Sequence, residues 1–206
     1  MLIQILILLV SLVTLVWSAD KFVFGASSLA RNFGISPMVI GLTIVAMGSS
    51  APEMMIAATA SLDGNANLAI GNAIGSNIAN IALVLGITAL FQPLMVSSST
   101  VKREIPLILF ITALAYWMLS DSYFGFNEGL SLMIGFFVYI IALLLITLRS
   151  TKNNPVVDPL IIEAEQEVPE AVSKPISIFW LVVGMVLLPM SAVYLVDSSV
   201  FIAKAF

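Results

Sequence analysis

Six apolar segments follow one another along the chain, and most of them are long enough to cross a lipid bilayer as a helix. A span of the hydrocarbon core needs about 20 apolar residues. Hydrophobic residues make up 60% of the sequence and charged residues only 10%, a composition far from that of soluble proteins. The segments are Leu2 to Phe33, Ser36 to Leu62, Ala66 to Phe91, Glu104 to Leu119, Leu130 to Leu148 and Ile176 to Phe206. The sequence therefore predicts an all-α membrane protein with six transmembrane helices.

The composition also argues against several functions. The chain has no cysteine and no histidine, so it offers neither thiolate nor imidazole ligands, which disfavours transition-metal chemistry. It has no basic patch of the kind that binds nucleic acid. The net charge of −4 says little about partners, because five acidic residues sit together in one linker.

One charged residue interrupts the second apolar segment. Glu53 follows the uncharged stretch from Ser36 to Pro52 and precedes nine more uncharged residues. A charge at the centre of a bilayer costs roughly 3 kcal/mol on insertion scales, so this carboxylate needs a compensating partner. Ser49 and Ser50 lie on or near its helix face, and Pro52 frees a backbone carbonyl of the preceding turn. These converging oxygen atoms favour a bound cation. The alternative is a structural carboxylate, protonated or bonded to a neighbouring helix.

Basic residues are distributed unevenly between the two sides of this predicted topology. One side carries Arg31, Lys102, Arg103, Arg149, Lys152 and Lys174. The other side carries Lys204, together with the acidic residues Asp63, Asp121 and Glu128. Since cytoplasmic loops are enriched in lysine and arginine, we expect the first side to face the cytoplasm and the N-terminus to lie outside.

The first and last apolar segments resemble each other. The aligned pairs are Ser18-Ala19 with Ser191-Ala192, Val23 with Val196, Ala30 with Ala203, Arg31 with Lys204 and Phe33 with Phe206. An odd number of helices separates equivalent points, so the second copy would start on the opposite side of the membrane, as in an inverted-topology transporter repeat. The alternative is a chance similarity between two apolar helices.

Two motifs on consecutive predicted helices carry a resemblance to a known family. Residues 41–53 read GLTIVAMGSSAPE and residues 71–80 read GNAIGSNIAN. In this order and at this spacing they closely resemble the first alpha repeat of the sodium/calcium exchanger superfamily. The resemblance covers essentially the whole chain, as the N-terminal half plus one helix of an ordinary exchanger.

The resemblance implies a membrane antiporter rather than an enzyme, one that exchanges calcium or a similar cation for sodium or protons and needs no cofactor. In that family ten helices form two inverted five-helix repeats, with the ion sites midway between them. The positions matching the family's metal-binding residues are Glu53, Asn80, Ser49, Ser50, Ser76 and the backbone carbonyl of Ala46. The family often has threonine where this chain has Ser49, which keeps the hydroxyl.

The second motif also has a reading that involves packing alone. Gly71 and Gly75 form a G-x-x-x-G pattern, which predicts close helix packing that would bring Asn80 towards Glu53. As isolated residues, Ser76 and Asn80 would more often bond neighbouring helices than ligate an ion.

The resemblance also predicts how the chain is organised. Residues 1–149 form the first exchanger repeat, residues 150–175 a cytoplasmic acidic linker, and residues 176–206 the first helix of an incomplete second repeat. Calcium takes about six to eight oxygen ligands, so the first repeat alone supplies half a site. We therefore expect a half-molecule in the inner (plasma) membrane of a prokaryote. Its partners would be the lipid bilayer and a second exchanger repeat, present as a missing C-terminal half, a separate chain or an inverted copy.

Two other function classes stay open at this point. One is a channel-like or cation-binding assembly that uses a single repeat without alternating access. The other is a structural membrane fragment without transport activity.

The predicted orientation can be tested by labelling cysteines introduced at Ser97 and Asn65, because the chain has no native cysteine. An impermeant thiol reagent added to intact cells should label the cysteine at position 65 and leave the cysteine at position 97 unlabelled. Labelling at position 97 with protection at position 65 would reverse the orientation.

Overall fold

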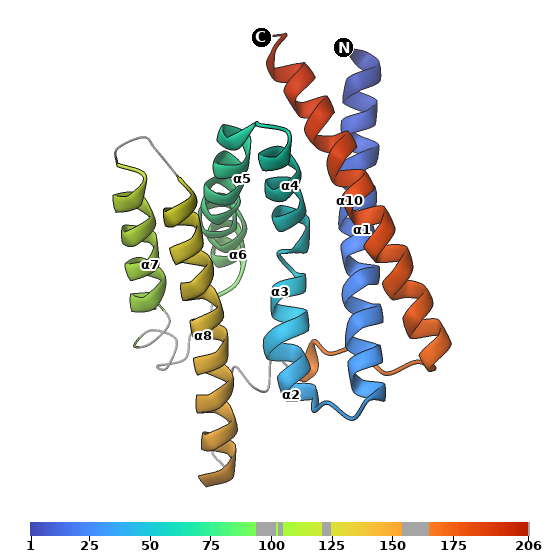
Figure 1. Ribbon diagram of the computed structural model, residues 1–206, viewed down its shortest axis with the longest axis vertical. Helices are drawn as coiled ribbons and strands as arrows, with labels where there is room; N and C mark the ends of the chain where they lie inside the picture. Colours follow the sequence, from blue (N-terminus) through green and yellow to red (C-terminus); the bar gives the residue numbers. More distant parts are fainter. Residues whose placement is uncertain (94–101, 103–104, 121–124, 154–164, 206) are drawn as a thin grey trace. The chain divides into compact units, whose positions relative to one another are not determined.

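The computed structural model describes residues 1–93, 102, 105–120, 125–153 and 165–205 (Figure 1). All regular structure in these ranges is helical. The chain divides into two compact units, Met1–Ile87 together with Leu160–Phe206, and Thr88–Pro159. The first unit contains every residue of the predicted ion site.

Several helices are suited to a bilayer, where each backbone polar group must be bonded within the protein. Among the described residues, four helices are long and apolar enough to cross a membrane, or five if one bent pair counts as a span. The four are Leu2–Asn32, Ala66–Phe91, Phe126–Leu145 and Lys174–Ala203, and the bent pair is Pro37–Gly48 with Ala51–Leu62. The helix α7, Ile105–Met118, is apolar but shorter. The chain is thus an all-α integral membrane protein.

Within the second unit, the helix α8 spans Phe126–Asn153. The hydropathy pattern predicts that this helix starts at Leu130, but it begins four residues earlier. The reason is a cap at the helix N-terminus: the N–H of Gly125 donates to Oε2 of Glu128 at 3.0 Å. This is one half of a capping box, in which an acidic side chain in the first turn bonds back to the residue that starts the helix. Glu128 therefore belongs to the helix rather than to the preceding loop.

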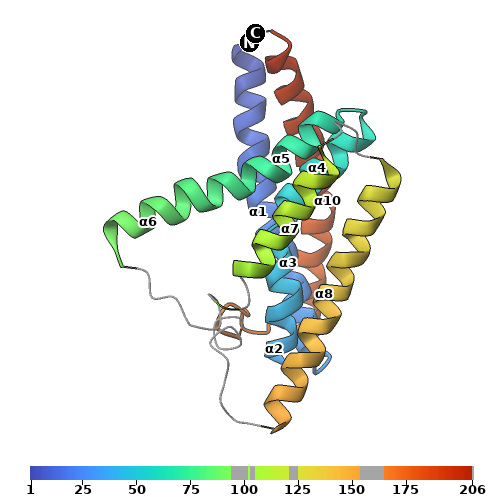
Figure 2. The same cartoon turned by 90° about the vertical axis from the view of Figure 1, so that its left-hand side faces the viewer.

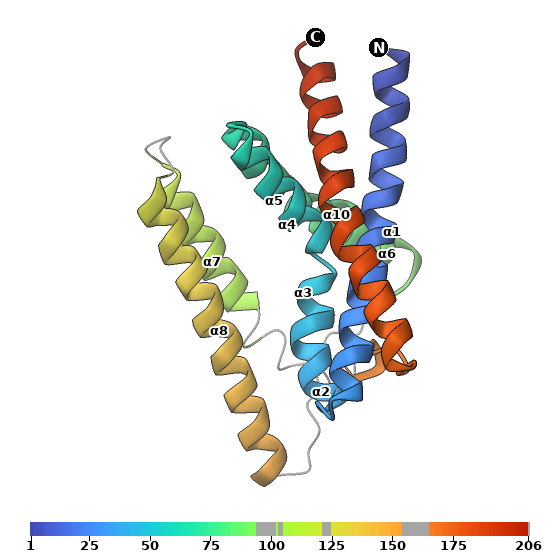
Figure 3. The same cartoon turned by 45° about the vertical axis from the view of Figure 1, so that its right-hand side comes forward.

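The first unit is built on a crossing of α1, Leu2–Asn32, and α10, Lys174–Ala203. The two helices run antiparallel, and both chain ends lie at the same end of the pair (Figures 1 and 3). Glycines allow the close approach. A Cβ on Gly184 would lie 2.5 Å from the backbone nitrogen of Phe22, and a Cβ on Gly25 would collide with the backbone of Leu181.

Small and apolar side chains fill the interface between these helices. Leu15 and Ala19 pack with Leu188, Ala192 and Leu195 in one buried cluster. Three buried serines of this interface, Ser11, Ser18 and Ser191, bond their hydroxyls to carbonyls of their own helix. Ser18 Oγ donates to the carbonyl of Leu15 at 2.9 Å, for example. Such internal bonding lets a polar side chain lie inside an apolar interface without a cost for an unpaired donor.

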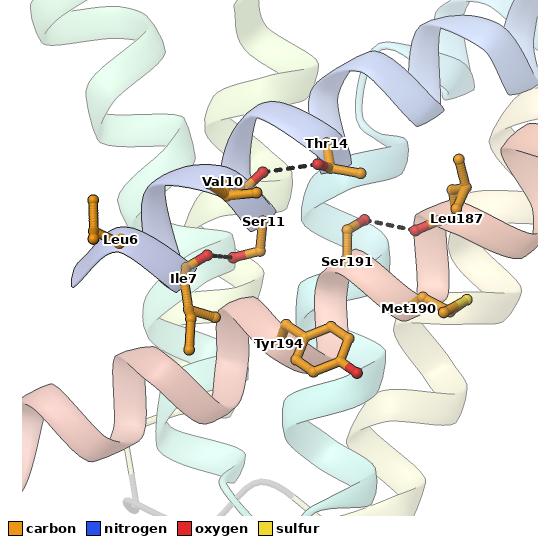
Figure 4. Close-up of a pocket in the computed structure, with 9 residues that line it drawn as sticks. All are labelled: Leu6, Ile7, Val10, Ser11, Thr14, Leu187, Met190, Ser191 and Tyr194. Atoms are coloured by element: carbon orange, nitrogen blue, oxygen red, sulfur yellow. Dashed lines mark hydrogen bonds between the residues drawn. The ribbon is translucent and has the colours of Figure 1, made fainter. Parts of the chain in front are cut away.

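The two ends of the α1–α10 pair differ. At one end the Ser28 and Ser177 hydroxyls are 2.7 Å apart, and Val172 N–H donates to Ser28 Oγ at 2.9 Å. The amide of Asn32 donates to the Val172 carbonyl at 2.8 Å, so this end is closed by hydrogen bonds. At the other end the helices separate around an apolar groove of about 430 Å³ (Figure 4). Leu6, Val10, Met190 and Tyr194 are among its lining residues.

The glycine contact predicts that Gly184→Ala destabilises the first unit. Because the added methyl group meets backbone atoms of Phe22, overpacking should cost about 1–3 kcal/mol. The measurement is the midpoint of thermal unfolding in detergent. Gly71→Ala is the matched control, since a Cβ there meets no described atom within 4 Å and alanine favours a helix by about 1 kcal/mol. Equal midpoints for the two variants would contradict the close crossing.

Candidate ion site

The helix that leads to the site contains an irregular turn. Ser36 accepts a bond from Val39 N–H at 3.5 Å, and Pro37 opens the short helix α2, Pro37–Ile40. A π-helical segment, η1, follows at Gly41–Val45, and α3 spans Ala46–Gly48. π-Helical segments are rare, and they occur frequently at functional sites.

The chain then breaks at Ser49 and Ser50, and α4, Ala51–Leu62, leaves at an angle of 46° to the preceding helix. Pro52 has no N–H, so the carbonyl of Gly48 loses the donor that a continuous helix would supply. The N–H of Ser50 donates to the carbonyl of Met47 at 3.2 Å. In a regular α-helix it would donate to the carbonyl of Ala46. The carbonyl oxygens of Ala46 and Gly48 therefore lose the backbone N–H donors that a regular helix would give them.

One of these oxygens is the carbonyl of Ala46. It accepts a hydrogen bond from Ser49 Oγ at 2.9 Å, and both residues are exposed in this chain. The hydroxyl of Ser49 keeps its lone pairs while it donates, because a hydroxyl is one donor and two acceptor sites. Ala46 and Ser49 therefore present adjacent oxygen atoms on one side of the break.

Glu53 lies in the first turn of α4, directly after the break. Its carboxylate oxygen Oε2 is buried and has no hydrogen-bond partner in the described structure. The N-terminus of a helix carries a partial positive charge that favours an anion, but an unpaired carboxylate oxygen in a membrane span still requires a partner. A cation that binds here would supply it.

The helix α5, Ala66–Ile78, returns antiparallel to α4 after a turn at Gly64, which has a φ of 77°. The N–H of Asn65 closes this turn by bonding to the Ala60 carbonyl at 2.8 Å. Further along, Asn72 Nδ2 donates to the backbone carbonyl of Glu53 at 3.0 Å. This bond links the two sequence motifs directly.

Asn72 is not among the site residues predicted from the two motifs. A signal was available, because Asn72 precedes Ser76 by four residues and Asn80 by eight, so the three share one helix face. Extending the spacing one turn backwards would have found it.

Ser76 and Asn80 come after Asn72 along the chain. The hydroxyl of Ser76 bonds within its own helix, to Ala73 at 3.2 Å. Asn80 belongs to a second π-helical segment, η2, Ala79–Leu85, and its side chain is exposed. From α5 the chain continues through η2 away from the α1–α10 pair (Figure 2). No recorded hydrogen bond in residues 66–85 joins Ser76 or Asn80 to the Glu53 side chain.

Within the first unit, as far as the structure describes it, the G-x-x-x-G pattern makes no close helix contact. A Cβ on Gly71 or Gly75 would meet no described atom within 4 Å. The structure thus gathers Ala46, Ser49, Ser50 and Glu53 at one break and leaves the second motif open on its glycine side.

A membrane-spanning helix that is broken beside an unpaired carboxylate, with freed carbonyls around it, is the arrangement found in ion-transporting membrane proteins. Comparison with known proteins agrees. Residues 3–146 match the family described as sodium/calcium exchanger protein, and the chain belongs to this family. The resemblance predicted from the two motifs is confirmed.

Individual relatives extend the match along the chain. The sequence is 49% identical over its 206 residues to CaxA of Alkalimonas amylolytica, provisionally named an antiporter. It is 36% identical over the same length to the inner membrane protein YrbG of Escherichia coli strain K12. The chain spans 63% of the length of each of these relatives.

A solved structure shares the fold. The sodium-calcium exchanger NCX_Mj soaked with 100 mM Na⁺ and 10 mM Sr²⁺ superposes with a TM-score of 0.54 at 30% identity. The similarity covers 99% of this chain and 62% of that chain.

Proposed function

We propose that this chain forms the first half of a membrane antiporter that exchanges calcium, or a similar cation, for sodium or protons. The observation that carries the proposal is the buried and unpaired Oε2 of Glu53 at a helix break in a membrane span. Relatives support the choice of ions. One, 42% identical over 114 residues, is named sodium/calcium exchanger MaX1 in Methanosarcina acetivorans.

The ligand set supports a half-site. Calcium takes about six to eight oxygen ligands and usually more than one carboxylate. At the break this chain offers one carboxylate, from Glu53, with the hydroxyls of Ser49 and Ser50 and the carbonyl of Ala46. We propose that a second exchanger repeat, which the longer relatives have room to contain, supplies the remaining ligands.

We further propose that Ser76 and Asn80 join the site when a second repeat packs against the open side of α5. The register of α4 and α5 supports this. Because the two helices are antiparallel, α5 runs from the bond between Asn72 and Glu53 towards the break at Ser49 and Ser50. Ser76 lies one turn further along α5 on the same face.

The α1–α10 pair supports the proposal of six helices, in which five form one repeat and α10 opens an inverted second repeat. Five of the aligned pairs of positions are buried in both helices. These pairs are Ser11 with Gly184, Leu15 with Leu188, Ser18 with Ser191, Ala19 with Ala192 and Gly25 with Ser198. The aligned pairs Val23 with Val196 and Ala30 with Ala203 have only one buried member each.

Charge in the first unit supports an N-terminus outside, and the bacterial and archaeal relatives support the inner membrane of a prokaryote. Arg31 donates to the Pro169 carbonyl at 3.2 Å, and Lys174 lies 5.2 Å from the ring of Phe33, so both cations share one end. Lys204 lines a pocket with Gly64 at the opposite end. The end with more basic residues would face the cytoplasm.

Glu53→Gln tests the site in an assembly that includes a second repeat. The amide keeps the size of the side chain but removes its charge, so calcium-dependent transport should be lost or the half-saturating calcium concentration should rise at least about tenfold, equivalent to about 1.4 kcal/mol. Expression should be nearly unchanged. Asp63→Asn, which removes a charge at an exposed helix end, is the matched control and should transport normally. Normal calcium flux in Glu53→Gln would refute the assignment.

The half-site predicts how the chain behaves alone. Reconstituted into proteoliposomes by itself, it should show no uptake of radioactive calcium driven by an outward sodium gradient or by a proton gradient. Co-expression with a second-repeat half from a longer relative should restore uptake. Gradient-driven uptake by the chain alone would overturn the half-molecule proposal in favour of an inverted homodimer.

A further inference from the structure

Asn72 makes the polar contact that joins the two motifs. Its Nδ2 donates to the backbone carbonyl of Glu53 at 3.0 Å, and its side chain is partly buried. A helix carbonyl has two lone pairs, of which the intrahelical bond uses one. Asn72 therefore uses the second lone pair and ties α5 to the same residue that carries the unpaired carboxylate.

The position of this bond in the interface matters. Between the turn at Gly64 and Asn72, α4 and α5 are held by apolar contacts, with Ala60 and Ala69 buried in one cluster. Beyond Asn72, described atoms leave the Gly75 side open, and α5 leads into the exposed segment η2. Going along α5 from the turn at Gly64, the bond of Asn72 is therefore the last recorded hydrogen bond to α4. Ser76 and Asn80 follow it.

Because α5 is a rigid helix, the bond of Asn72 also affects the positions of residues further along it. At 1.5 Å per residue, Ser76 lies about 6 Å and Asn80 about 12 Å beyond Asn72 on the same face. A small change in the tilt or rotation of α5 at Asn72 therefore moves Asn80 by a larger distance. The apolar cluster near the turn is non-directional, whereas a hydrogen bond prefers one alignment.

From these observations we infer that Asn72 is a positioning residue for the ion site, which fixes the rotation and tilt of α5 relative to Glu53. The helix-positioning part rests on the structure alone, and its consequence for cation affinity rests on the proposed function. Asn72 itself does not ligate the ion. It acts through the direction in which it holds the helix of Ser76 and Asn80.

Spin labels test the helix-positioning part, since the chain has no native cysteine. Met54 on α4 and Ile74 on α5 are 55% and 46% exposed, so cysteines there accept labels without entering the core. Pulsed electron resonance then gives the distribution of distances between the two helices. Asn72→Leu, which keeps much of the volume but removes the donor, should widen or shift this distribution. Asn72→Gln, which keeps an amide donor, should restore it in part.

Asn67→Leu is the matched control, because Asn67 lies on the same helix, is exposed and makes no recorded hydrogen bond to α4. It should leave the distance distribution unchanged. An unchanged distribution in Asn72→Leu would overturn the inference at once.

Calcium dependence tests the consequence, in an assembly that contains a second repeat. Losing one directed hydrogen bond should raise the half-saturating calcium concentration about three- to tenfold, with the maximal rate kept within about twofold, and Asn72→Gln should recover part of the affinity. A widened distribution with unchanged calcium dependence would reduce Asn72 to a structural contact and overturn its positioning role. If the unsubstituted assembly moves no calcium, the proposed function fails, while the spin-label result still decides whether Asn72 positions α5.

Discussion

A lipid bilayer offers no water to a charged side chain, and the structure around Glu53 is organised by that constraint. A continuous helix would use every backbone oxygen internally and leave the carboxylate without polar neighbours. The break at Ser49 and Ser50 changes this, because Pro52 cannot donate to the preceding turn and the helix bends by 46° there. The same few residues thus create the charge, expose the carbonyl of Ala46 and begin a new helix whose positive end faces the carboxylate.

The helix that carries Glu53 is held from two sides. On one side, Ala51 and Met55 of α4 pack against the apolar cluster of Leu15 and Leu188 in the α1–α10 pair. That pair is close-packed at glycines and bonded at one end through Ser28 and Ser177, among other residues. On the other side, Asn72 bonds the backbone of Glu53 itself. Packing thus fixes the start of α4, and a directed hydrogen bond fixes the adjacent helix α5. Together they give the site a defined geometry in a region with few polar groups.

Hydropathy and the motifs predicted most of the helices, because long apolar runs have few alternative solutions in a membrane. They predicted one continuous segment from Ser36 to Leu62, whereas the structure breaks it at Ser49 and Ser50 with a bend of 46°. They did not predict that α8 starts at Phe126, since the pattern treats Glu128 as a loop residue while its carboxylate caps the helix. They also missed Asn72. Helical periodicity identifies which residues share a helix face, but it does not identify the helix against which that face packs. For the same reason Gly71 and Gly75 signal close packing although no described helix of the first unit fills the space beside them.

Glu53 is fixed through its backbone and left unpaired at its side chain, and this division suits reversible ion binding. A salt bridge to a protein cation would stabilise the carboxylate, but it would compete with every ion that arrives. In the described residues the one recorded ion pair joins Lys21 to Asp20 at 2.8 Å, with Lys21 Nζ also 5.5 Å from the ring of Trp180. That lysine is therefore engaged elsewhere, and Glu53 has no protein cation as its recorded partner. Under the proposed function, a mobile cation would neutralise the carboxylate. Because no protein cation among the described residues would have to move aside first, its binding and release would need only the ion and the surrounding oxygens to exchange.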